Sequence, residues 1–97
     1  MKTILTTEVY DAFEAKLKDL AGRARIQARI QRLAHGNPGD HRNLRHGVSE
    51  LRIDVGPGYR VYYTERRDGT IVVLLVGGDK STQQRDIAVA YELADQL

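Results

Sequence analysis

One stretch, Gly47–Lys80, constrains the fold more than any other part of the chain, because it reads as three consecutive strands. Across Val48–Val55 apolar residues alternate with charged ones, which is the period of a strand with one buried face. A second alternating segment, Tyr59–Arg66, follows a Gly-Pro-Gly break, and Asp68-Gly69 then predicts a tight hairpin turn. The third segment, Ile71–Val76, is apolar at every position, as is typical of a central strand covered on both faces. The stretch therefore predicts a small antiparallel sheet.

Helical periodicity precedes this sheet. Apolar residues recur at helical spacing across Glu8–Leu20 and again across Arg23–His35. Gly22, between the two segments, is expected to end the first helix. The Gly-Asn-Pro-Gly run at 36–39 stops the second helix, because proline cannot continue it. Two adjacent helices with a short break indicate an αα-hairpin packed on one face of the sheet. Before them, the β-prone segment Lys2–Thr6 predicts an opening strand that joins the sheet.

The remaining segments complete the predicted order of elements. Asp40–Gly47 reads as a polar connector between the second helix and the sheet. After the sheet, Ser81 and Gln84 have the spacing of a capping box, and a last helix is expected over Thr82–Asp95 with Tyr91 on its buried stripe. The predicted order is β-α-α-β-β-β-α, an α+β fold with its helices gathered on one side of a mostly antiparallel sheet.

Composition narrows the class of protein. The 97 residues suffice for a single domain, residues 1–97, and the lack of cysteine excludes disulfides and thiolate chemistry. The longest apolar run, Ile71–Val76, is far too short to span a membrane, and the first residues lack the apolar stretch of a signal peptide. We therefore expect a cytoplasmic protein without a membrane partner.

Charge is distributed unevenly, although the net charge is only +2. The segment Ala21–His46 contains six arginines and a single acid, Asp40. Such a basic segment is the electrostatic signature of a nucleic-acid partner, but it also suits an ordinary solvated helix face. Charge alone weighs the two interpretations equally, and both stay open at this point.

Three cations on or beside the predicted sheet are candidate site residues. Arg52 and Arg60 occupy outward positions on neighbouring strands, and Lys80 follows the third strand. Held by rigid strands, the three side chains could converge on a phosphate group. Lys80 also stands at the start of the last helix, where a cation is electrostatically unfavourable, so it either helps to bind an anion or is simply exposed. The three histidines lack the spacing of a zinc site, so no metal is expected.

Several of these motifs together resemble a known family. The segments GVSELRIDVGPGYRVYY and LLVGGDKSTQQRDI, preceded by ARIQARIQRL and GNPGD, resemble the RelE/ParE superfamily of toxins from bacterial type II toxin–antitoxin modules. More narrowly, they look like the HigB-like, phage-derived addiction module killer proteins. The resemblance covers nearly the whole chain. It implies a small RelE-like antiparallel sheet with an N-terminal helical hairpin, and it implies no cofactor.

The resemblance also implies growth inhibition that a cognate antitoxin holds in check. Many relatives cleave mRNA in the ribosomal A site, which would make the ribosome and mRNA partners. The ParE branch instead inhibits DNA gyrase without chemistry of its own, so one fold serves two activities. We expect the ribosome-dependent mRNA endonuclease first, with gyrase inhibition as the alternative and an inactive antitoxin-binding module third. The antitoxin is expected to lay a helix or strand over the basic sheet face or the helical hairpin.

Matching the family's positions assigns roles to individual residues. Arg60, in the GYR motif, matches the arginine that many nuclease members use on the scissile phosphate, because a guanidinium is always charged and offers a planar fork of donors. Arg52 matches a basic position on the preceding strand. Lys80 matches one after the last strand, where it holds phosphate or acts as a general acid. Tyr62 shares a face with Arg60 and either stacks on a base or packs internally.

Further contacts follow from the same match. The basic second helix, with Arg25, Arg29 and Arg32, is expected to lie against ribosomal RNA. His46 is the equivalent of a histidine that other members supply from the loop before the sheet, although a solvated loop is the favoured interpretation. Some members carry a catalytic tyrosine in the last helix, where this chain reads Gln-Gln-Arg-Asp-Ile at 83–87. No obvious general base remains. Either Lys80, Asp79 or His46 fills that role, or catalysis relies mainly on charge stabilisation and positioning by the ribosome.

Overall fold

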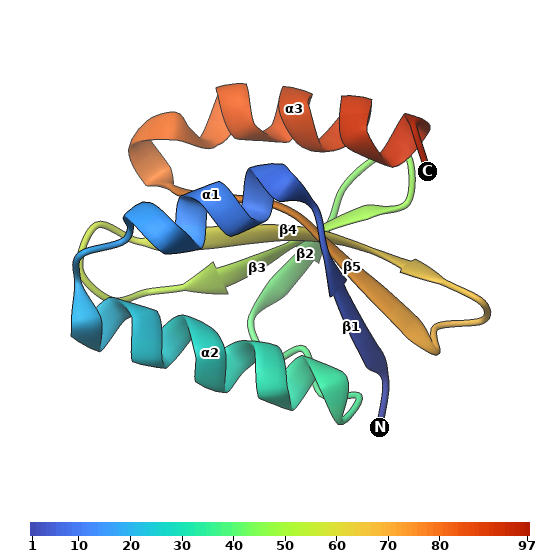
Figure 1. The fold of residues 1–97 in the computed structure, drawn as a ribbon, viewed down its shortest axis with the longest axis horizontal. Helices are drawn as coiled ribbons and strands as arrows, with labels where there is room; N and C mark the ends of the chain where they lie inside the picture. Colours follow the sequence, from blue (N-terminus) through green and yellow to red (C-terminus); the bar gives the residue numbers. More distant parts are fainter.

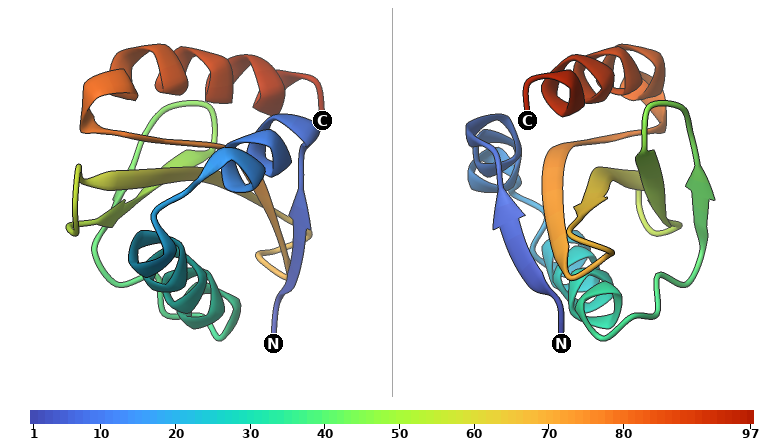
Figure 2. Two further views of the ribbon diagram at one scale, coloured as in Figure 1. Left: turned by 60° about the vertical axis from the view of Figure 1, so that its left-hand side comes forward. Right: turned by 90° about the vertical axis from the view of Figure 1, so that its right-hand side faces the viewer.

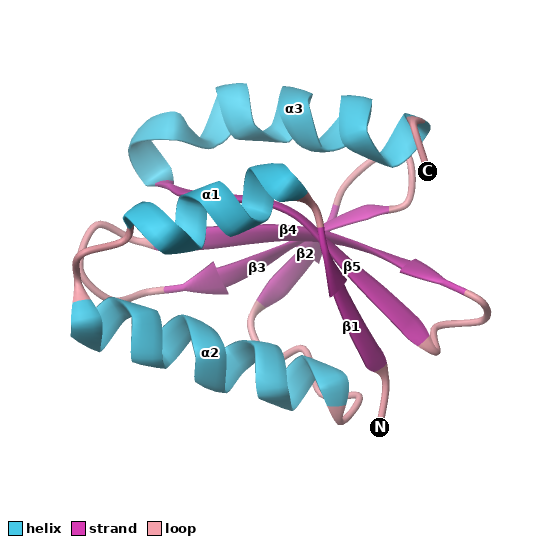
Figure 3. Ribbon diagram, in the orientation of Figure 1, coloured by secondary structure: helices cyan, strands magenta, loops and turns pink.

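The computed structural model describes residues 1–97, and its helices and strands form three layers with a single sheet in the middle (Figures 1 and 3). The elements in chain order are β1 (Thr3–Thr6), α1 (Glu8–Lys16), α2 (Leu20–Ala34), β2 (His41–Asn43), β3 (Val48–Ile53), β4 (Tyr59–Arg66), β5 (Ile71–Asp79), the 3₁₀ turn η1 (Lys80–Thr82) and α3 (Gln83–Asp95). None of the three helices is at once long enough and apolar enough to cross a membrane. The expected α+β class, with two helices before a mostly antiparallel sheet and one helix after it, is confirmed.

The sheet has the strand order β1-β5-β4-β3-β2, and β4 is its central strand. All pairs are antiparallel except β1 with β5, so the expected opening strand does join the sheet. β3 ends at Ile53 rather than Val55, because Ile53 pairs with Tyr59, the first residue of β4, and the residues between them form the turn. β5 runs on to Asp79 instead of stopping at Val76, because its two glycines continue the pairing with β4.

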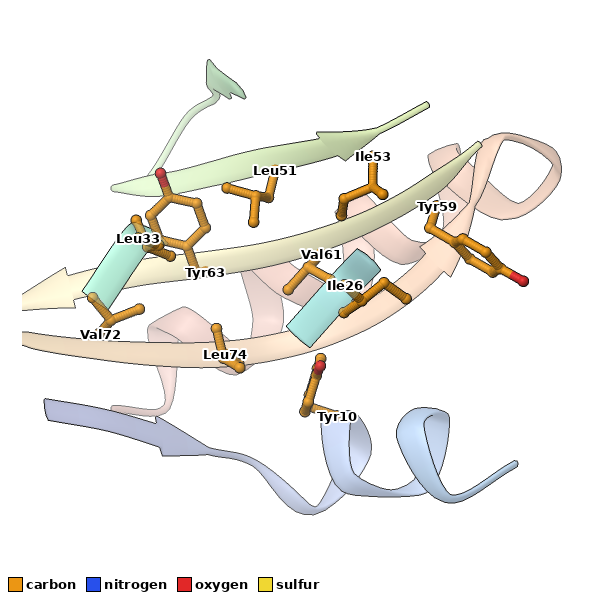
Figure 4. Close-up of a cluster of buried hydrophobic side chains, with 10 residues drawn as sticks. All are labelled: Tyr10, Ile26, Leu33, Leu51, Ile53, Tyr59, Val61, Tyr63, Val72 and Leu74. Atoms are coloured by element: carbon orange, nitrogen blue, oxygen red, sulfur yellow. The ribbon is translucent and has the colours of Figure 1, made fainter. Parts of the chain in front are cut away.

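Helices cover both faces of the sheet, which corrects the expectation that they gather on one side. Helices α1 and α2 pack on one face, over a cluster of ten buried residues that Figure 4 draws: Tyr10, Ile26, Leu33, Leu51, Ile53, Tyr59, Val61, Tyr63, Val72 and Leu74. Helix α3 lies over the opposite face of the sheet (Figure 2). Its Ala90 and Ala94 pack against Val48, Tyr62 and the other side of β5. The apolar run of β5 already requires this arrangement, because each of its faces needs a cover.

The break between the first two helices lies earlier than expected. Helix α1 ends at Lys16 and α2 begins at Leu20, so Gly22 belongs to the first turn of α2. The side chain of Asp19 caps that turn by accepting from the backbone N–H of Gly22. A Cβ at Gly22 would lie 2.5 Å from Cε2 of Tyr59, so glycine is present for close packing of the helix on the sheet and not as a helix breaker.

Two further local expectations are wrong. The polar connector contains the edge strand β2, which pairs with β3 although all three of its residues are exposed. The capping box is formed by Asp79 and Thr82 around η1, and not by Ser81 and Gln84. Asp79 takes this role because its carboxylate accepts from the N–H of Ser81 at 2.8 Å at the very end of β5.

Candidate functional site

The candidate site lies on the α3 face of the sheet, at the end of β3 and β4 nearest the start of α3. Arg52 on β3 pairs directly with Arg60 on β4, which in turn pairs with Gly78 on β5. One row further along, Arg42 on β2 pairs with Glu50 on β3. Because side chains of directly paired residues share a face, the pairing gathers three arginines and a carboxylate into one cluster. We call Arg42, Glu50, Arg52 and Arg60 the arginine cluster.

Arg60 is the buried member of the cluster. Only 2% of the residue is exposed, so the expectation that it faces outward into solvent is wrong. It sits on the central strand, where neighbouring strands and the cover of α3 leave little open surface. Its Nη1 donates to the carbonyl of Tyr59 at 2.9 Å and lies 3.6 Å from a carboxylate oxygen of Asp54, while its Nε makes no hydrogen bond.

Glu50 is a site residue that the sequence reasoning missed. Its side chain is 0% exposed, and Oε2 accepts from the hydroxyl of Tyr62 at 3.0 Å and from Nε2 of Gln83 at 2.7 Å. Oε1 accepts no hydrogen bond, but a nitrogen of Arg42 and one of Arg52 each lie 3.6 Å from it. The available signal was its position two residues before Arg52, which places the carboxylate on the same strand face as that arginine.

Tyr62 packs internally, so its predicted stacking on a base does not fit this structure. The side chain is fully buried beneath α3 and donates its hydroxyl to Glu50. Burial, and then the charge of Glu50, raise the pKa of the Tyr62 phenol well above its ordinary value. The hydroxyl therefore stays protonated and remains a hydrogen-bond donor.

Lys80 lies on the rim of the same end of the sheet. Its backbone N–H bonds to the carbonyl of Gly58, and its aliphatic stem runs so close to Gly58 that a Cβ there would lie 2.9 Å from the lysine carbons. The lysine is exposed and lines a polar pocket of about 400 Å³ together with Arg85 and residues 81–84. At this point α3 begins: its N-cap Thr82 makes no side-chain cap bond, and the backbone N–H of Gln83 is bonded to the carbonyl of Lys80 in the preceding 3₁₀ turn.

The arginines of α2 divide into two kinds. Arg29 donates to the carbonyls of Arg52, Pro38 and Asp40 at 2.6–2.8 Å, so its guanidinium joins α2 to the sheet and the connector. Arg25 and Arg32 are exposed, and their side chains make no comparable hydrogen bonds to the sheet or the connector. Of the three arginines expected to contact RNA, two are therefore free on the surface and one is engaged inside the protein.

His46 lies at the other end of β3, so the structure does not bring it into the arginine cluster. Val48 and Arg52 are four residues apart along the strand, which corresponds to about 13 Å. The ring of His46 packs edge-on against Tyr91 with centroids 4.9 Å apart, and the Tyr91 hydroxyl accepts from the N–H of Arg45 at 3.3 Å. Tyr91 is half-buried and holds this loop against α3, a more peripheral position than the core assignment.

The titratable groups of the cluster set the chemistry that this face can perform. Arg42 and Arg52 are 50% and 38% exposed at their side chains, so both can reach a ligand while Glu50 lies beneath them. No three His, Asp or Glu side chains lie together in a way that could hold a metal ion. With Lys80 on the rim, the cluster presents cations toward solvent and is suited to binding a phosphate-bearing ligand.

Comparison with known proteins gives three findings. Residues 9–96 match the family model described as phage-derived protein Gp49-like (DUF891). A protein of Haemophilus influenzae, described as an uncharacterized protein, is 51% identical over 94 residues, which cover 97% of this chain and 94% of that protein. The free-state structure of an arginine-to-alanine double mutant of the E. coli toxin RelE superposes with a TM-score of 0.69 over 98% of this chain and 95% of that one, at 16% identity.

Proposed function

The chain belongs to the phage-derived Gp49-like family (DUF891) and has the fold of the toxin RelE, and on this premise we propose that it is the toxin of a type II toxin–antitoxin module which cleaves mRNA on the ribosome. Within the superfamily we place it in the HigB-like group. The observation that carries the proposal is the direct pairing of Arg52 with the buried Arg60, whose Nε has no protein partner. Because Nε is itself buried, an anionic ligand would meet the guanidinium of Arg60 at its exposed edge, beside the partly exposed Arg52.

The proposed reaction is cleavage of the RNA backbone by its own ribose. The 2′-oxygen attacks the adjacent phosphorus, the bond to the 5′-oxygen of the next nucleotide breaks, and a 2′,3′-cyclic phosphate and a 5′-hydroxyl result. The 2′-hydroxyl gives up one proton and the leaving oxygen takes one up, so the net charge does not change. Negative charge accumulates on the phosphorane oxygens, and preorganised cations lower the barrier by stabilising it.

The residues of the cluster have distinct roles in this proposal. Arg60 binds a non-bridging oxygen of the scissile phosphate, and the half-exposed Arg52 binds a second one. Lys80, on the rim beside the start of α3, binds the phosphate or protonates the leaving oxygen. Asp79 is already engaged as the cap of η1 and His46 lies at the far end of β3, which leaves Lys80 as the candidate for proton transfer.

The exposed arginines of α2 are proposed to contact ribosomal RNA. Arg25 and Arg32 have no ion-pair partner in the fold, and such cations bind phosphates with a strong dependence on salt. His46, which packs against Tyr91 of α3, stays a separate proposed RNA contact. Arg29 is engaged by carbonyl groups of the sheet and the connector, so it holds α2 in place. The proposed antitoxin is a protein that covers the arginine cluster with acidic side chains, and the proposed site of action is the cytoplasm, where ribosomes are available.

Non-enzymatic inhibition of DNA gyrase is the second candidate function. It is favoured by one observation: the exposed carboxylate beside the cluster, that of Asp54, forms an ion pair with Nη1 of Arg60 at 3.6 Å, so it is engaged by the cation and not free to act as a general base. A gyrase inhibitor requires only a binding surface. In that case substitutions in the helical hairpin would matter more than those at Arg60, and affected cells would show DNA damage with intact mRNA.

The deciding experiment is primer extension on a reporter mRNA in a purified translation system, with and without ribosomes. Wild type is compared with Arg60→Ala and with Arg60→Lys, which keeps the charge but loses the planar fork. Cuts that require ribosomes and disappear in both variants are the expected result. Circular dichroism and thermal melts establish that each variant is folded.

A matched control is Arg67→Asn. Arg67 is also an arginine of the sheet region, but it lies in the β4–β5 turn with a φ of 53°, which asparagine tolerates well. The turn is at the opposite end of β4, about 20 Å from Arg60 along the strand. This variant should cut like wild type. Intact mRNA in every lane, from protein that still stops growth, would refute the nuclease and favour gyrase.

A further inference from the structure

The buried carboxylate of Glu50 is the unusual element of the arginine cluster. Removing a carboxylate from water costs several kcal/mol, so such a group persists only where its environment compensates it. Here Oε2 receives two hydrogen bonds, from Tyr62 and Gln83, which join β4 and α3 to the strand that carries Glu50. Oε1 accepts no hydrogen bond, and the cost of burying its charge is offset by the positive charges of two guanidinium groups, each 3.6 Å away.

The strand register explains why both guanidinium groups meet at one oxygen. Arg42 is the direct cross-strand neighbour of Glu50, and Arg52 is two residues along the same strand and therefore on the same face. Both arginine side chains are partly exposed above a carboxylate that is not. The Glu50 carboxylate is thus fixed in the interior. The two guanidinium groups lie between it and solvent, and both are partly exposed.

We propose that Glu50 is a positioning residue that fixes the guanidinium groups of Arg42 and Arg52 beside Arg60, and that Arg42 is a further phosphate-binding residue of the site. This inference rests on the proposed function and deepens it. Arg42 comes from β2, the strand at the edge of the sheet, so the site extends over three neighbouring strands. The ligand is a stretch of RNA backbone whose adjacent phosphates reach Arg60 and Arg42.

Glu50 acts through the arginines and does not take a proton from RNA. Its side chain has no exposed surface, and the two donors on Oε2 together with the two guanidinium groups beside Oε1 leave no approach for a ribose hydroxyl. Its effect on cleavage must therefore be carried by the arginines. Replacing it should change the rate in the same way as removing Arg52, which gives the proposal a specific kinetic signature.

The kinetic test is a double-mutant cycle in the ribosome-dependent cleavage assay. Glu50→Gln keeps the size of the side chain but removes its charge, and kcat should fall about 10- to 100-fold because the arginines lose their fixed geometry. KM for the ribosome–mRNA complex should stay the same or decrease, because one negative charge has been removed from a surface that binds RNA. Combined with Arg52→Ala, the loss should not exceed that of the larger single substitution by more than about twofold.

Asp86→Asn is the matched control. Asp86 is also a buried carboxylate on this face, but its Oδ2 accepts from Thr82 and its only ion-pair contact is Arg85, outside the cluster. Its effect on kcat should be independent of Arg52→Ala, so the two losses should multiply. If the losses from Glu50→Gln and Arg52→Ala also multiply, or if KM rises while kcat is unchanged, the proposal is overturned.

A second readout does not depend on cleavage. In ¹⁵N-labelled protein, the Nε–H signal of Arg52 should shift in Glu50→Gln, because that nitrogen lies beside Oε1, while the Nε–H signal of Arg23 on α2 should not. An unchanged Arg52 signal overturns the positioning role. If wild type cuts no mRNA but the Arg52 signal does shift, the nuclease proposal fails and the positioning of Arg52 by Glu50 still holds.

Discussion

Two fully buried tyrosines allow the contribution of one hydrogen bond to be isolated. Tyr62 and Tyr10 are both essentially unexposed, at 0% and 1%. The Tyr62 hydroxyl donates to the Glu50 carboxylate at 3.0 Å, whereas the Tyr10 hydroxyl makes no hydrogen bond. Replacing each by phenylalanine removes one oxygen and keeps the ring, so packing changes little in either case. The two substitutions therefore differ mainly in the hydrogen bond that is lost.

The expected magnitudes follow from this difference. A hydrogen bond to a charged group contributes about 1.5–3 kcal/mol, so Tyr62→Phe should lower the free energy of unfolding by about 2 kcal/mol. For a domain of this size that corresponds to a decrease in Tm of about 8–16 °C. Tyr10→Phe removes a buried hydroxyl that is not compensated, so the free energy of unfolding should stay within about 0.5 kcal/mol of wild type or increase.

The assay is urea and thermal unfolding at neutral pH, followed by circular dichroism. The m-value should be unchanged in both variants, because the surface exposed on unfolding is almost the same. If Tyr10→Phe destabilises the protein as much as Tyr62→Phe, the ring environment and not the hydrogen bond decides the result. The assignment of Glu50 as a carboxylate supported by Tyr62 would then be wrong.

Three further predictions concern the same framework. Gly22→Ala should lower the free energy of unfolding by about 1–2 kcal/mol in urea titrations, because the new methyl group meets the ring of Tyr59 at 2.5 Å; a gain would show that the ring moves aside. Burial raises the pKa of Tyr62 and Tyr63, so both contribute stability that is complete below about pH 10 and is lost as the pH rises further. The part of the tyrosinate absorbance that Tyr62→Phe or Tyr63→Phe removes should therefore appear together with unfolding, and ionisation of these two residues well before unfolding would contradict this. The Gly22 N–H and then the Tyr59 hydroxyl lower the pKa of Asp19, so the stability it contributes is present above about pH 4 and is lost in more acidic solution. Asp19→Ala should lower Tm at neutral pH and reduce the acid-side decrease, and an unaltered pH profile in thermal melts would exclude that role.

Sequence patterns predicted the parts of the fold in which each residue's neighbours are set locally. The bounds of β4 are those expected, because alternation and a Gly-rich turn on each side define a strand without reference to the rest of the chain. β2 could not be found in this way, since three exposed polar residues have no period and the pairing with β3 alone makes them a strand. Gly22 was misplaced for a related reason, because the contact that requires a glycine there comes from Tyr59.

The site shows the same division between local pattern and tertiary contact. The positions of Arg52 and Arg60 on neighbouring strands follow from alternation and were expected, whereas their direct pairing depends on a register that the Gly-Pro-Gly turn sets and the structure shows. The burial of Arg60 and Glu50 depends on α3 covering that face, and periodicity within one strand does not reveal which face a distant helix covers. Alternation alone therefore predicts that Arg60, on the central strand, faces solvent, whereas the structure buries it. The apolar run of β5 was the available indication that both faces are covered.

The parallel pairing of β1 with β5 has a consequence for the order in which the protein is made. Thr3 lies beside Ile71 and Thr6 beside Leu74, so the first strand to be synthesised has no strand to pair with until most of the chain has followed. Contacts so distant in sequence form late in folding. Two residues that contact the arginine cluster, Gly78 beside Arg60 and Gln83 at Glu50, are synthesised later still. The cationic face therefore cannot be complete until the segments that follow residue 77 have been made and folded, although its arginines are synthesised well before them.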